Sequence, residues 1–426
     1  MRINKCTGGR DGSIVLKNTF SLYFMTIAKY VFPLLLFPYL TRILGTETYG
    51  VVTYMTAVAN YVSLVIDFGF NFSATRKISK CREDKRAVAK VYASVVQAKV
   101  MLGLLSGVGV VVLVPFIPIL RENFAVLIAY YISTVILVFL PDFIYRGFEQ
   151  MQGVTIRYVL SKAITTALTL LLVKGPEHLL LVPIFSGVGN LVSIMFTWIH
   201  IKKSFGLTFR FESFRCALLE IKESSVFFIS TFASTAFTLA NTLFMGIVNL
   251  SETDIACWGV AFQLISIVMS LYEPITTSIY PRMVSSKNLK LIHMALFLAM
   301  PVILTGIVFC YFMAPILVDI VAGTGYDTAV DVFRIMLPVL LFTYPAQLLG
   351  FPVLGAVNKE KYATSSTVVS AIFHIVGLIL LIASRSFTLV SVAILRSMTE
   401  FIFMVLRICF YLKVRRCFVE RPSTTE

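Results

Sequence analysis

Charged residues are scarce in this 426-residue chain. Asp, Glu, Lys and Arg together make up 14% of it, whereas apolar residues make up 58%. A soluble domain usually carries about 25% charged residues, which it needs to cover a surface that faces water. The composition therefore excludes a soluble protein and indicates a chain that lies in lipid.

The sequence also lacks the residue patterns of enzymes and metal sites. Its seven cysteines are odd in number and form no CxxC pair, and it has only four histidines. No Walker loop, GxSxG elbow or HExxH motif is present. We therefore expect no disulfide framework, no metal site and no cofactor. The short loops favour a transporter over an enzyme, and a proton or cation gradient stays open as its source of energy.

Apolar runs long enough to cross a bilayer, about 20 residues each, recur from end to end. Because backbone polar groups in lipid need internal partners and the runs do not alternate, they predict helices rather than barrel strands. The spans are placed near 19–41, 49–71, 91–114, 124–144, 154–173, 179–200, 225–248, 254–280, 291–318, 331–355, 363–384 and 387–412. The predicted fold is an all-α membrane protein with about twelve transmembrane helices.

Basic residues are distributed unevenly between the two ends of these spans. Twenty-eight Lys and Arg residues fall on the side that holds both chain termini. The other side has five: Arg42, Arg121, Lys174, Arg334 and Arg385. An excess of Lys and Arg marks the cytoplasmic side, so both termini are predicted to be cytoplasmic. The net charge of +15 then reflects topology, and nucleic-acid binding is not predicted.

The two halves of the chain resemble each other weakly. Asp67 and Arg76, which close the second span, recur as Glu273 and Arg282, which close the eighth span, at the same offset. Six spans per half is an even number, so both halves would share one orientation in the membrane. We predict two six-helix lobes, residues 1–210 with helices 1–6 and residues 211–426 with helices 7–12, around a central cavity.

Polar side chains repeat at helical spacing along four spans. Such stripes in lipid usually face protein or a water-filled cavity. The members are Thr19, Tyr23, Thr26 and Lys29 in the first span; Thr53, Thr56, Asn60, Ser63, Asp67 and Asn71 in the second; Ser230, Ser234, Thr238 and Asn241 in the seventh; and Gln263, Ser266, Ser270, Glu273 and Thr277 in the eighth. We expect these stripes to meet across a cleft between the lobes; the alternative is that they join packed helices.

Lysines within spans have two interpretations each. Lys29 lies in the middle of the first span, where it either faces the cavity or pairs with a neighbouring helix. Lys99 lies two turns inside the third span, where it either faces the cavity or extends its amine to the cytoplasmic surface.

Two acid–base pairs have the spacing of intrahelical ion pairs. Asp142 and Arg146 lie four residues apart at the end of the fourth span, and Arg396 and Glu400 repeat that spacing in the twelfth. A simple intrahelical salt bridge is the preferred interpretation for the second pair, whereas Asp142 and Arg146 also stay candidates for the cavity.

Several segments resemble a known family. Residues 66–76 (IDFGFNFSATR) closely resemble the second-helix signature of O-antigen (Wzx/RfbX-type) polysaccharide flippases. Residues 37–45 (FPYLTRILG) match the family's first helix and turn, and residues 274–282 are similar to its eighth helix. Residues 333–335 and 355–359 also fit the tenth helix. The resemblance extends over most of the chain.

This resemblance implies the MOP (MATE-like) transporter fold in the bacterial inner membrane. It also implies a cargo, namely an undecaprenyl-diphosphate-linked oligosaccharide repeat unit that is moved from the cytoplasmic to the periplasmic leaflet for O-antigen or related polysaccharides. Expected partners are an O-antigen polymerase, a chain-length regulator and a ligase. The alternatives are a MATE-like small-molecule antiporter and a non-transporting scaffold of the assembly complex.

The cargo assigns roles to the polar residues. Lys29, Arg76 and Arg282 are candidates for pairing with the diphosphate. Substrate contacts are also expected from Asn60, Asn71 and Asn241. Asp67 and Glu273 are candidates for coupling to a proton or cation, since their charge would bias the lobes between two states. An alternative for Asp67 is a structural ion pair with Arg76 or a neighbouring loop. Lys99, Asp142 and Arg146 complete the candidates.

Overall fold

The computed structural model describes residues 8–415 apart from 208 and 210. Within this range it leaves aside the side chains of residues 8–20, 22, 23, 230, 234, 236, 237 and 281. Four members of the predicted polar stripes, Thr19, Tyr23, Ser230 and Ser234, therefore have side chains outside the described part. The terminal tails, which hold part of the basic excess, also lie outside it.

The described residues form helices and no strand, which confirms the all-α prediction. Among the residues that the structure describes, ten helices are long and apolar enough to cross a membrane. The number is eleven if a bent pair of helices in residues 214–247 counts as one span. The chain divides into two compact units, residues 1–231 and 232–426, which are described one at a time below. A count of twelve spans, the division after residue 210 and a central cavity between the lobes stay predictions.

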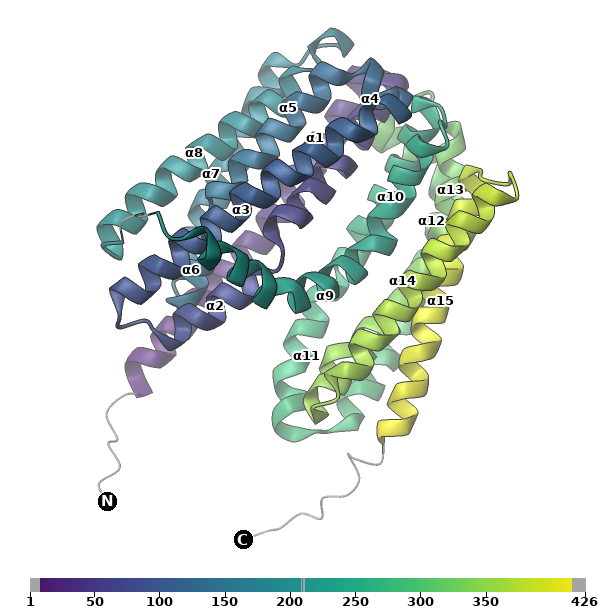
Figure 1. Ribbon diagram of the computed structural model, residues 1–426. Coiled ribbons are helices and arrows are strands. Elements are labelled where there is room, and N and C mark those ends of the chain that lie inside the picture. Colours follow the sequence, from purple (N-terminus) through teal and green to yellow (C-terminus); the bar gives the residue numbers. More distant parts are fainter. Residues whose placement is uncertain (1–7, 208, 210, 416–426) are drawn as a thin grey trace. The chain divides into compact units, whose positions relative to one another are not determined.

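The first unit consists of eight helices and the beginning of a ninth (Figure 1). They are α1 (Gly8–Asp67), α2 (Phe70–Lys80), α3 (Lys85–Leu113), α4 (Pro118–Glu122), α5 (Phe124–Ile136), α6 (Asp142–Gly147), α7 (Met151–Leu172), α8 (Leu181–Ser204) and the start of α9 (Phe214–Ile247). Helices α7 and α8 pack along each other, α1 packs on α7, and α2 packs on α6. The predicted fourth span is thus broken into α5 and α6, with Pro141 at the start of α6.

Helix α1 contains two predicted spans that join at Gly45. This glycine has φ 72° and ψ 174°, which interrupts the helix. The rings of Phe37 and Tyr49 have centroids 6.0 Å apart, although twelve residues of straight helix would separate them by about 18 Å. The chain therefore turns sharply at Gly45, where the sequence predicts a loop between the first and second spans.

The signature at residues 66–76 forms the break between α1 and α2. Phe68 and Gly69 both have positive φ angles, 38° and 76°. A Cβ atom on Gly69 would lie 2.6 Å from Cβ of Phe227, and the ring of Phe68 stacks on Phe228 at 4.2 Å between centroids. Phe70 is fully buried. The signature thus has a structural role, because it lets the start of α9 pack directly on the backbone.

Replacing Gly69 by alanine is expected to lower the free energy of unfolding by about 1–3 kcal/mol, because the new Cβ would be both strained and in contact with Phe227. Thermal unfolding of the purified protein in detergent measures this effect. Gly109→Ala is the matched control, since Gly109 lies inside α3 with nothing within 4 Å of its Cβ position. Equal unfolding temperatures for the two variants would contradict the structural role.

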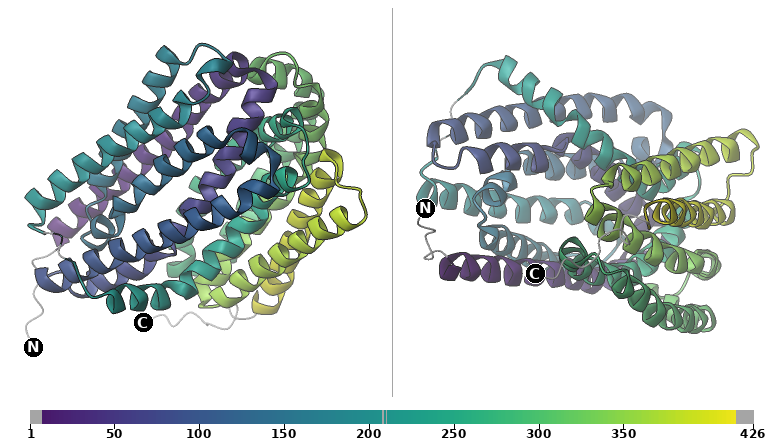
Figure 2. Two further views of the ribbon diagram at one scale, coloured as in Figure 1. Left: turned by 45° about the horizontal axis from the view of Figure 1, so that its top comes forward. Right: turned by 90° about the horizontal axis from the view of Figure 1, so that it is seen from below.

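The second unit consists of the rest of α9 and six further helices (Figure 1). They are α10 (Glu252–Ser270), α11 (Tyr272–Ser286), α12 (Leu289–Ala322), α13 (Asp327–Leu349), α14 (Glu360–Ala383) and α15 (Leu389–Val414). Helix α15 packs along both α13 and α14, as the yellow and light-green ribbons of Figure 2 show. The predicted eighth span is broken into α10 and α11 at Leu271.

A π-helical turn, Gly350–Leu354, extends α13 and packs against α11, α14 and α15. Such turns insert an extra residue into a helix and are frequent at functional sites. Gly350, where the turn begins, has a non-helical conformation with φ −69° and ψ −121°, and Phe351 and Pro352 of the turn line a cavity of the second unit.

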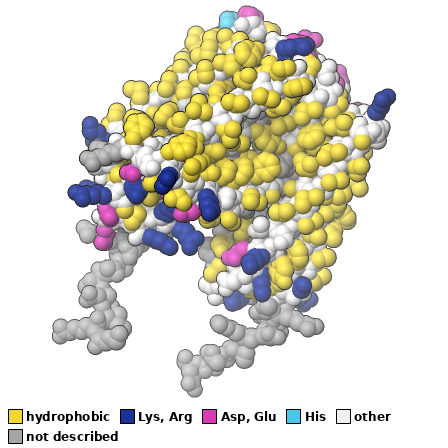
Figure 3. All heavy atoms as spheres, in the orientation of Figure 1, with side chains coloured by type: hydrophobic (Ala, Val, Ile, Leu, Met, Phe, Trp, Pro, Cys, Tyr) yellow, Lys and Arg dark blue, Asp and Glu magenta, His cyan; other side chains and the backbone are white. Residues whose placement is uncertain are grey.

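Apolar side chains cover most of the surface on the face that Figure 3 shows, and dark-blue Lys and Arg side chains gather near helix ends. Leu104, Phe297 and Val302 are 68%, 78% and 70% exposed. Water would make such surfaces costly, whereas lipid accepts them. The protein is therefore a multi-pass membrane protein, as its composition predicts.

Candidate functional site

The first unit contains a small polar cavity of about 270 Å³ between α1, α2, α3, α7 and α8 and the segment that joins α5 to α6. Four predicted site residues line it: Asp67, Asn71, Lys99 and Asp142. The other polar lining residues are Ser63, Arg157, Tyr158, Ser161, Lys162, Asn190 and Ser193. The last three residues of the stripe on the second span, Ser63, Asp67 and Asn71, therefore face a cavity within this unit. Whether it also faces a cleft between the lobes stays a prediction.

Asp67 forms an ion pair with Lys99 in this cavity. The Lys99 amine lies 2.8 Å from Oδ1 of Asp67 and donates to it. The Lys99 side chain is only 3% exposed, whereas Asp67 is 45% exposed. Lys99 therefore does not extend to the surface, and the partner of Asp67 is neither Arg76 nor a loop. A half-exposed carboxylate on α1 thus pairs with a buried amine on α3 inside this unit.

Asp142 also has a partner on another helix. It accepts a hydrogen bond from Nη2 of Arg157 in α7. The spacing of Asp142 and Arg146 suggested an intrahelical pair, but Arg146 is exposed. Arg157 is 6% exposed although the sequence placed it among the cytoplasmic charges. Counting basic residues near a span end does not show which of them turn inward, and the acidic partner on the facing helix decides this.

Arg157 and Lys162 are cavity residues that the sequence analysis missed. Nε of Arg157 is buried without a hydrogen-bond partner, as is Oδ1 of Asn71. Lys162 forms no ion pair within the described part of the chain. The available signal was the charge itself, because Lys162 lies in the middle of the apolar run of α7, where a lysine is expensive.

Arg76 lies at a separate basic pocket of about 300 Å³ on α2, together with Lys77, Lys80, Ser73 and Glu223. Lys77 pairs with Glu220 at 2.7 Å and with Glu223 at 2.8 Å. Arg76 itself is exposed. It is therefore placed to meet an anion from solvent, and this role stays a prediction.

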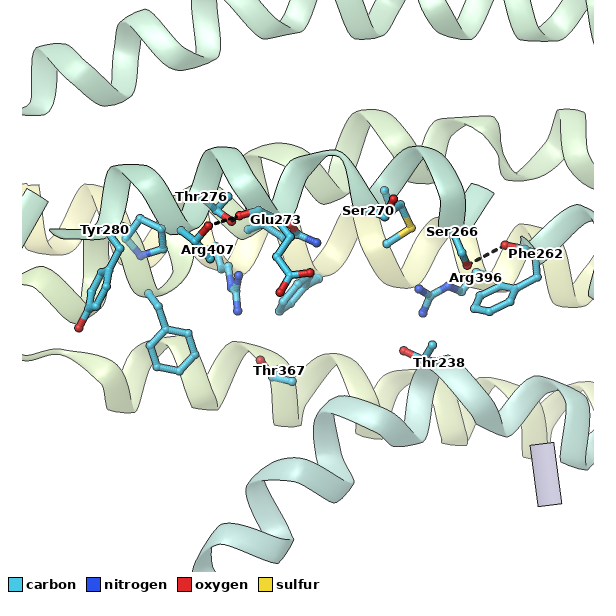
Figure 4. Close-up of a pocket in the computed structure, with 16 residues that line it drawn as sticks. Thr238, Phe262, Ser266, Ser270, Glu273, Thr276, Tyr280, Thr367, Arg396 and Arg407 are labelled. Atoms are coloured by element: carbon cyan, nitrogen blue, oxygen red, sulfur yellow. Dashed lines mark hydrogen bonds between the residues drawn. The ribbon is translucent and has the colours of Figure 1, made fainter. Parts of the chain in front are cut away.

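The second unit contains a larger cavity of about 710 Å³, lined by α9, α10, α11, α13, the π-helical turn, α14 and α15. Ser266, Ser270, Glu273 and Thr277 of the predicted eighth-span stripe line it, as does Thr238. Figure 4 shows Glu273, Arg396 and Arg407 extending into this space, with Thr238 and Thr367 on other helices facing it. Four aromatic residues also line it: Phe262, Tyr280, Phe351 and Phe403. Hydroxyls, aromatic rings and guanidinium groups are thus combined in one cavity.

The two arginines of this cavity have different partners. Arg396 pairs with Glu400 at 2.8 Å, one helical turn away, and both side chains are 2% exposed, which agrees with the preferred interpretation of this spacing. Arg407 is 6% exposed. Its Nε donates to Oγ of Ser366 at 3.2 Å and its Nη1 donates to the carbonyl of Ala346. Arg407 lies near the end of the twelfth predicted span, among the basic residues assigned to the cytoplasmic side, so its burial in a cavity was not predicted.

Asn241 joins three helices through His374. Nε2 of His374 lies 2.9 Å from Oδ1 of Asn241 in α9, and Nδ1 lies 2.7 Å from Oγ1 of Thr399 in α15. Asn241 and His374 are fully buried. The geometry gives His374 of α14 a structural role between helices, and a substrate contact for Asn241 stays a prediction.

The remaining predicted residues lie outside the two cavities. Lys29 and Asn60 are exposed on α1, Arg146 on α6 and Arg282 on α11. Neither cavity includes them among its lining residues. Exposure leaves them accessible to cargo or lipid headgroups, so their assignment to substrate also stays a prediction.

Comparison with known proteins gives a family and a fold. A family model described as "Polysaccharide biosynthesis protein" matches residues 15–287. A protein named "Putative O-antigen transporter" from Escherichia coli (strain K12) is 25% identical over 354 residues, which cover 81% of this chain and 84% of that protein. A protein of the same name from Shigella dysenteriae is 24% identical, with 84% of this chain and 91% of that protein covered.

Among solved structures, a multidrug resistance MATE family transporter of the MOP superfamily in an inward-facing conformation matches with a TM-score of 0.67. The match covers 94% of this chain and 96% of that one at 13% identity. These comparisons confirm the resemblance found in the sequence and the MATE-like fold. Since the family model covers more than half of the chain, the protein belongs to the polysaccharide biosynthesis protein family.

Proposed function

We propose that this protein moves lipid-linked oligosaccharide repeat units from the cytoplasmic to the periplasmic leaflet, for O-antigen or a related polysaccharide. The protein is a membrane transporter and not an enzyme, in line with the names of its relatives and structural neighbours. The observation that carries the finer proposal is the 710 Å³ cavity, because it combines hydroxyls, aromatic rings and a buried guanidinium inside apolar helices.

The expected cargo fits this chemistry. An undecaprenyl-diphosphate-linked oligosaccharide has a charged diphosphate and a hydrated sugar chain, both of which are costly to place in hydrocarbon. Its polyprenyl tail is stable in lipid. Hydroxyls such as Ser266 and Thr367 can bond to sugar hydroxyls, and an arginine can form charge-assisted bonds to phosphate. A polar cavity can therefore shelter the head of the molecule while its tail stays in the membrane.

Transport by alternating access needs a group whose charge differs between two states. We assign this role to Asp67 and Glu273. Protonation of Asp67 would remove the charge that pairs with Lys99 and leave a buried amine to find another partner. Glu273 lines the second cavity, where its charge would oppose an anionic cargo. The driving ion is then a proton or another cation.

Diphosphate capture at the membrane surface is assigned to Lys29, Arg76 and Arg282, which are exposed. Substrate contacts are assigned to Asn60, Asn71 and Asn241. The proposal also places the protein in the bacterial inner membrane with both termini in the cytoplasm. Its partners there are an O-antigen polymerase, a chain-length regulator and a ligase.

The MATE-like fold makes a small-molecule antiporter the second candidate, because the structural match is a multidrug transporter. Such a protein would confer resistance to cationic compounds. Arg407, a buried arginine at the larger cavity that forms no ion pair among the described residues, disfavours cationic cargo, since like charges repel most strongly where water is excluded.

Deleting the gene tests the proposed function. Undecaprenyl-linked single repeat units should then accumulate in the cytoplasmic leaflet, and the wild-type gene should restore polymer export. Normal arrival of lipid-linked repeats in the periplasm of the deletion strain would refute transport of this cargo. A scaffold would instead keep export unchanged when Lys29, Arg76 and Asp67 are neutralised in stably inserted protein.

A further inference from the structure

Arg407 is a buried cation, and Glu400, an acidic group whose charge acts on it, forms its ion pair with Arg396 instead. Its side chain lies in α15 and is 6% exposed, and no ion pair involves it in the residues that the structure describes. Burying a guanidinium in a membrane protein is unfavourable unless other groups compensate for its lost hydration. Arg396 on the same helix is compensated by Glu400. Arg396 is thus neutralised by an ion pair and Arg407 is not, which indicates that the charge of Arg407 has a role other than packing.

The surroundings of Arg407 hold its guanidinium in one place. Its Cζ lies 4.0 Å from the centroid of the Phe403 ring, which is a favourable cation–π arrangement. The carbonyl of Ala346 and the hydroxyl of Ser366 accept from it. A Cβ atom on Gly350, the first residue of the π-helical turn, would clash with Nη1 of Arg407. The turn and its glycine therefore create the space that the guanidinium occupies.

The guanidinium also has free hydrogen-bonding capacity beside open space. An arginine has five N–H donors, and the two bonds to Ser366 and Ala346 use two of them. Arg407 lines the 710 Å³ cavity together with Phe403, Gln347, Thr276 and Thr367, and Figure 4 shows its guanidinium directed into that space. Three remaining donors on a planar, fixed group match the oxygens of a phosphate.

We propose that Arg407, positioned by Gly350 and the π-helical turn, binds a phosphate group of the cargo inside the cavity of the second unit. This inference rests on the proposed function and specifies which residue holds the anionic part of the lipid-linked substrate. The chemistry is that of a phosphate or diphosphate ester, and a lipid-linked diphosphate is its expected source rather than free pyrophosphate.

Binding to the purified full-length protein in detergent tests this site, with farnesyl diphosphate as the probe. Farnesol serves as the uncharged control and inorganic pyrophosphate as the lipid-free one. Because hydrogen bonds to charged groups contribute about 1.5–3 kcal/mol, Arg407→Gln should weaken farnesyl diphosphate binding by about 10- to 100-fold. Arg407→Lys keeps the positive charge but lacks the planar set of N–H donors, so its affinity should lie between those of the wild type and Arg407→Gln. Lys361→Gln, which removes an exposed charge from α14, should bind as the wild type does.

Gly350→Ala leaves Arg407 unchanged and forces its guanidinium, the flexible end of the side chain, to shift from its present position. It should lower the affinity for farnesyl diphosphate, though by less than Arg407→Gln does, and thermal unfolding without ligand identifies any variant that fails to fold. Should Arg407→Gln misfold, Gly350→Ala and Arg407→Lys still decide the matter. Wild-type affinity in folded Arg407→Gln, or no binding of farnesyl diphosphate by the wild type, would overturn the site.

The probes and a transport assay separate the remaining cases. Arg407-dependent binding of pyrophosphate without binding of farnesyl diphosphate would overturn the assignment to lipid-linked cargo. If the wild type binds farnesyl diphosphate through Arg407 but transports no lipid-linked repeat, the proposed function fails while the phosphate site stands. If transport proceeds and Arg407→Gln transports as well as the wild type, the site fails while the proposed function stands.

Discussion

Replacing Arg396 by methionine is expected to lower the free energy of unfolding by about 3–5 kcal/mol, since it leaves the carboxylate of Glu400 buried without its partner. Both side chains are 2% exposed and lie 2.8 Å apart on α15. Water cannot replace the lost partner at such burial. Thermal or denaturant unfolding of the purified protein in detergent measures the loss, and the yield of inserted protein should fall with it.

The double variant Arg396→Met/Glu400→Met shows whether the loss of stability comes from the unpaired carboxylate or from the loss of the arginine's packing. Two well-packed apolar side chains often replace a buried ion pair with little loss of stability, so the double variant should be more stable than Arg396→Met alone. Asp331→Asn is the exposed control, because Asp331 and Arg334 lie 3.9 Å apart and are 72% and 31% exposed. Its effect should stay below about 1 kcal/mol. A single variant as stable as the wild type would contradict the buried-pair account.

Transport is expected to fall tenfold or more in Lys99→Met, although stability should change by only about 1 kcal/mol. The stability effect is small because Asp67 is 45% exposed and water can solvate its carboxylate. The transport effect is large because the proposed coupling needs the Lys99–Asp67 pair to form and break. Flipping of lipid-linked repeats by membrane vesicles, followed across a range of pH, measures both the rate and its dependence on protons.

The double variant Asp67→Asn/Lys99→Met distinguishes coupling from packing. It removes both charges, so it should unfold like the wild type but transport slowly and with little dependence on pH. Arg82→Met is the control for loss of a cation from an exposed ion pair, that of Arg82 with Glu149, and should transport normally. Wild-type transport by the double variant would show that the pair serves structure alone.

The fold class followed from the sequence because lipid imposes one strong requirement, that every backbone polar group be paired internally. Composition and the length of apolar runs were sufficient for that conclusion. The position of breaks inside spans was harder to predict than their presence. Pro274 indicates a kink in the eighth span, because proline cannot bond to the carbonyl of Ser270, and the structure separates α10 from α11 at Leu271. The break at Phe68 and Gly69 lies in an apolar run, and the packing of α9 on it shows why the helix ends there.

The polar stripes were predicted in part. Helical spacing placed Asp67 with Asn71 and Ser270 with Glu273, and the structure brings each pair to one cavity within its own unit. Arg157 and Arg407 were counted as cytoplasmic charges because they lie near span ends. The direction in which such a residue turns depends on partners far away in sequence, such as Asp142, and no periodicity contains that information.

Reconstitution of the purified protein into liposomes tests whether it moves lipid-linked repeats across a bilayer. Lipid-linked oligosaccharide repeats are placed in both leaflets, and the fraction accessible to an added glycan-modifying enzyme is followed over time. The account predicts that wild-type protein exposes the inner pool, that Arg407→Gln does so far more slowly, and that protein-free liposomes keep the pool hidden. The control liposomes contain no protein, and the folded wild-type protein is tested with a proton or cation gradient in either direction. If the inner pool is then no more accessible than in the protein-free liposomes, the proposed transport is contradicted.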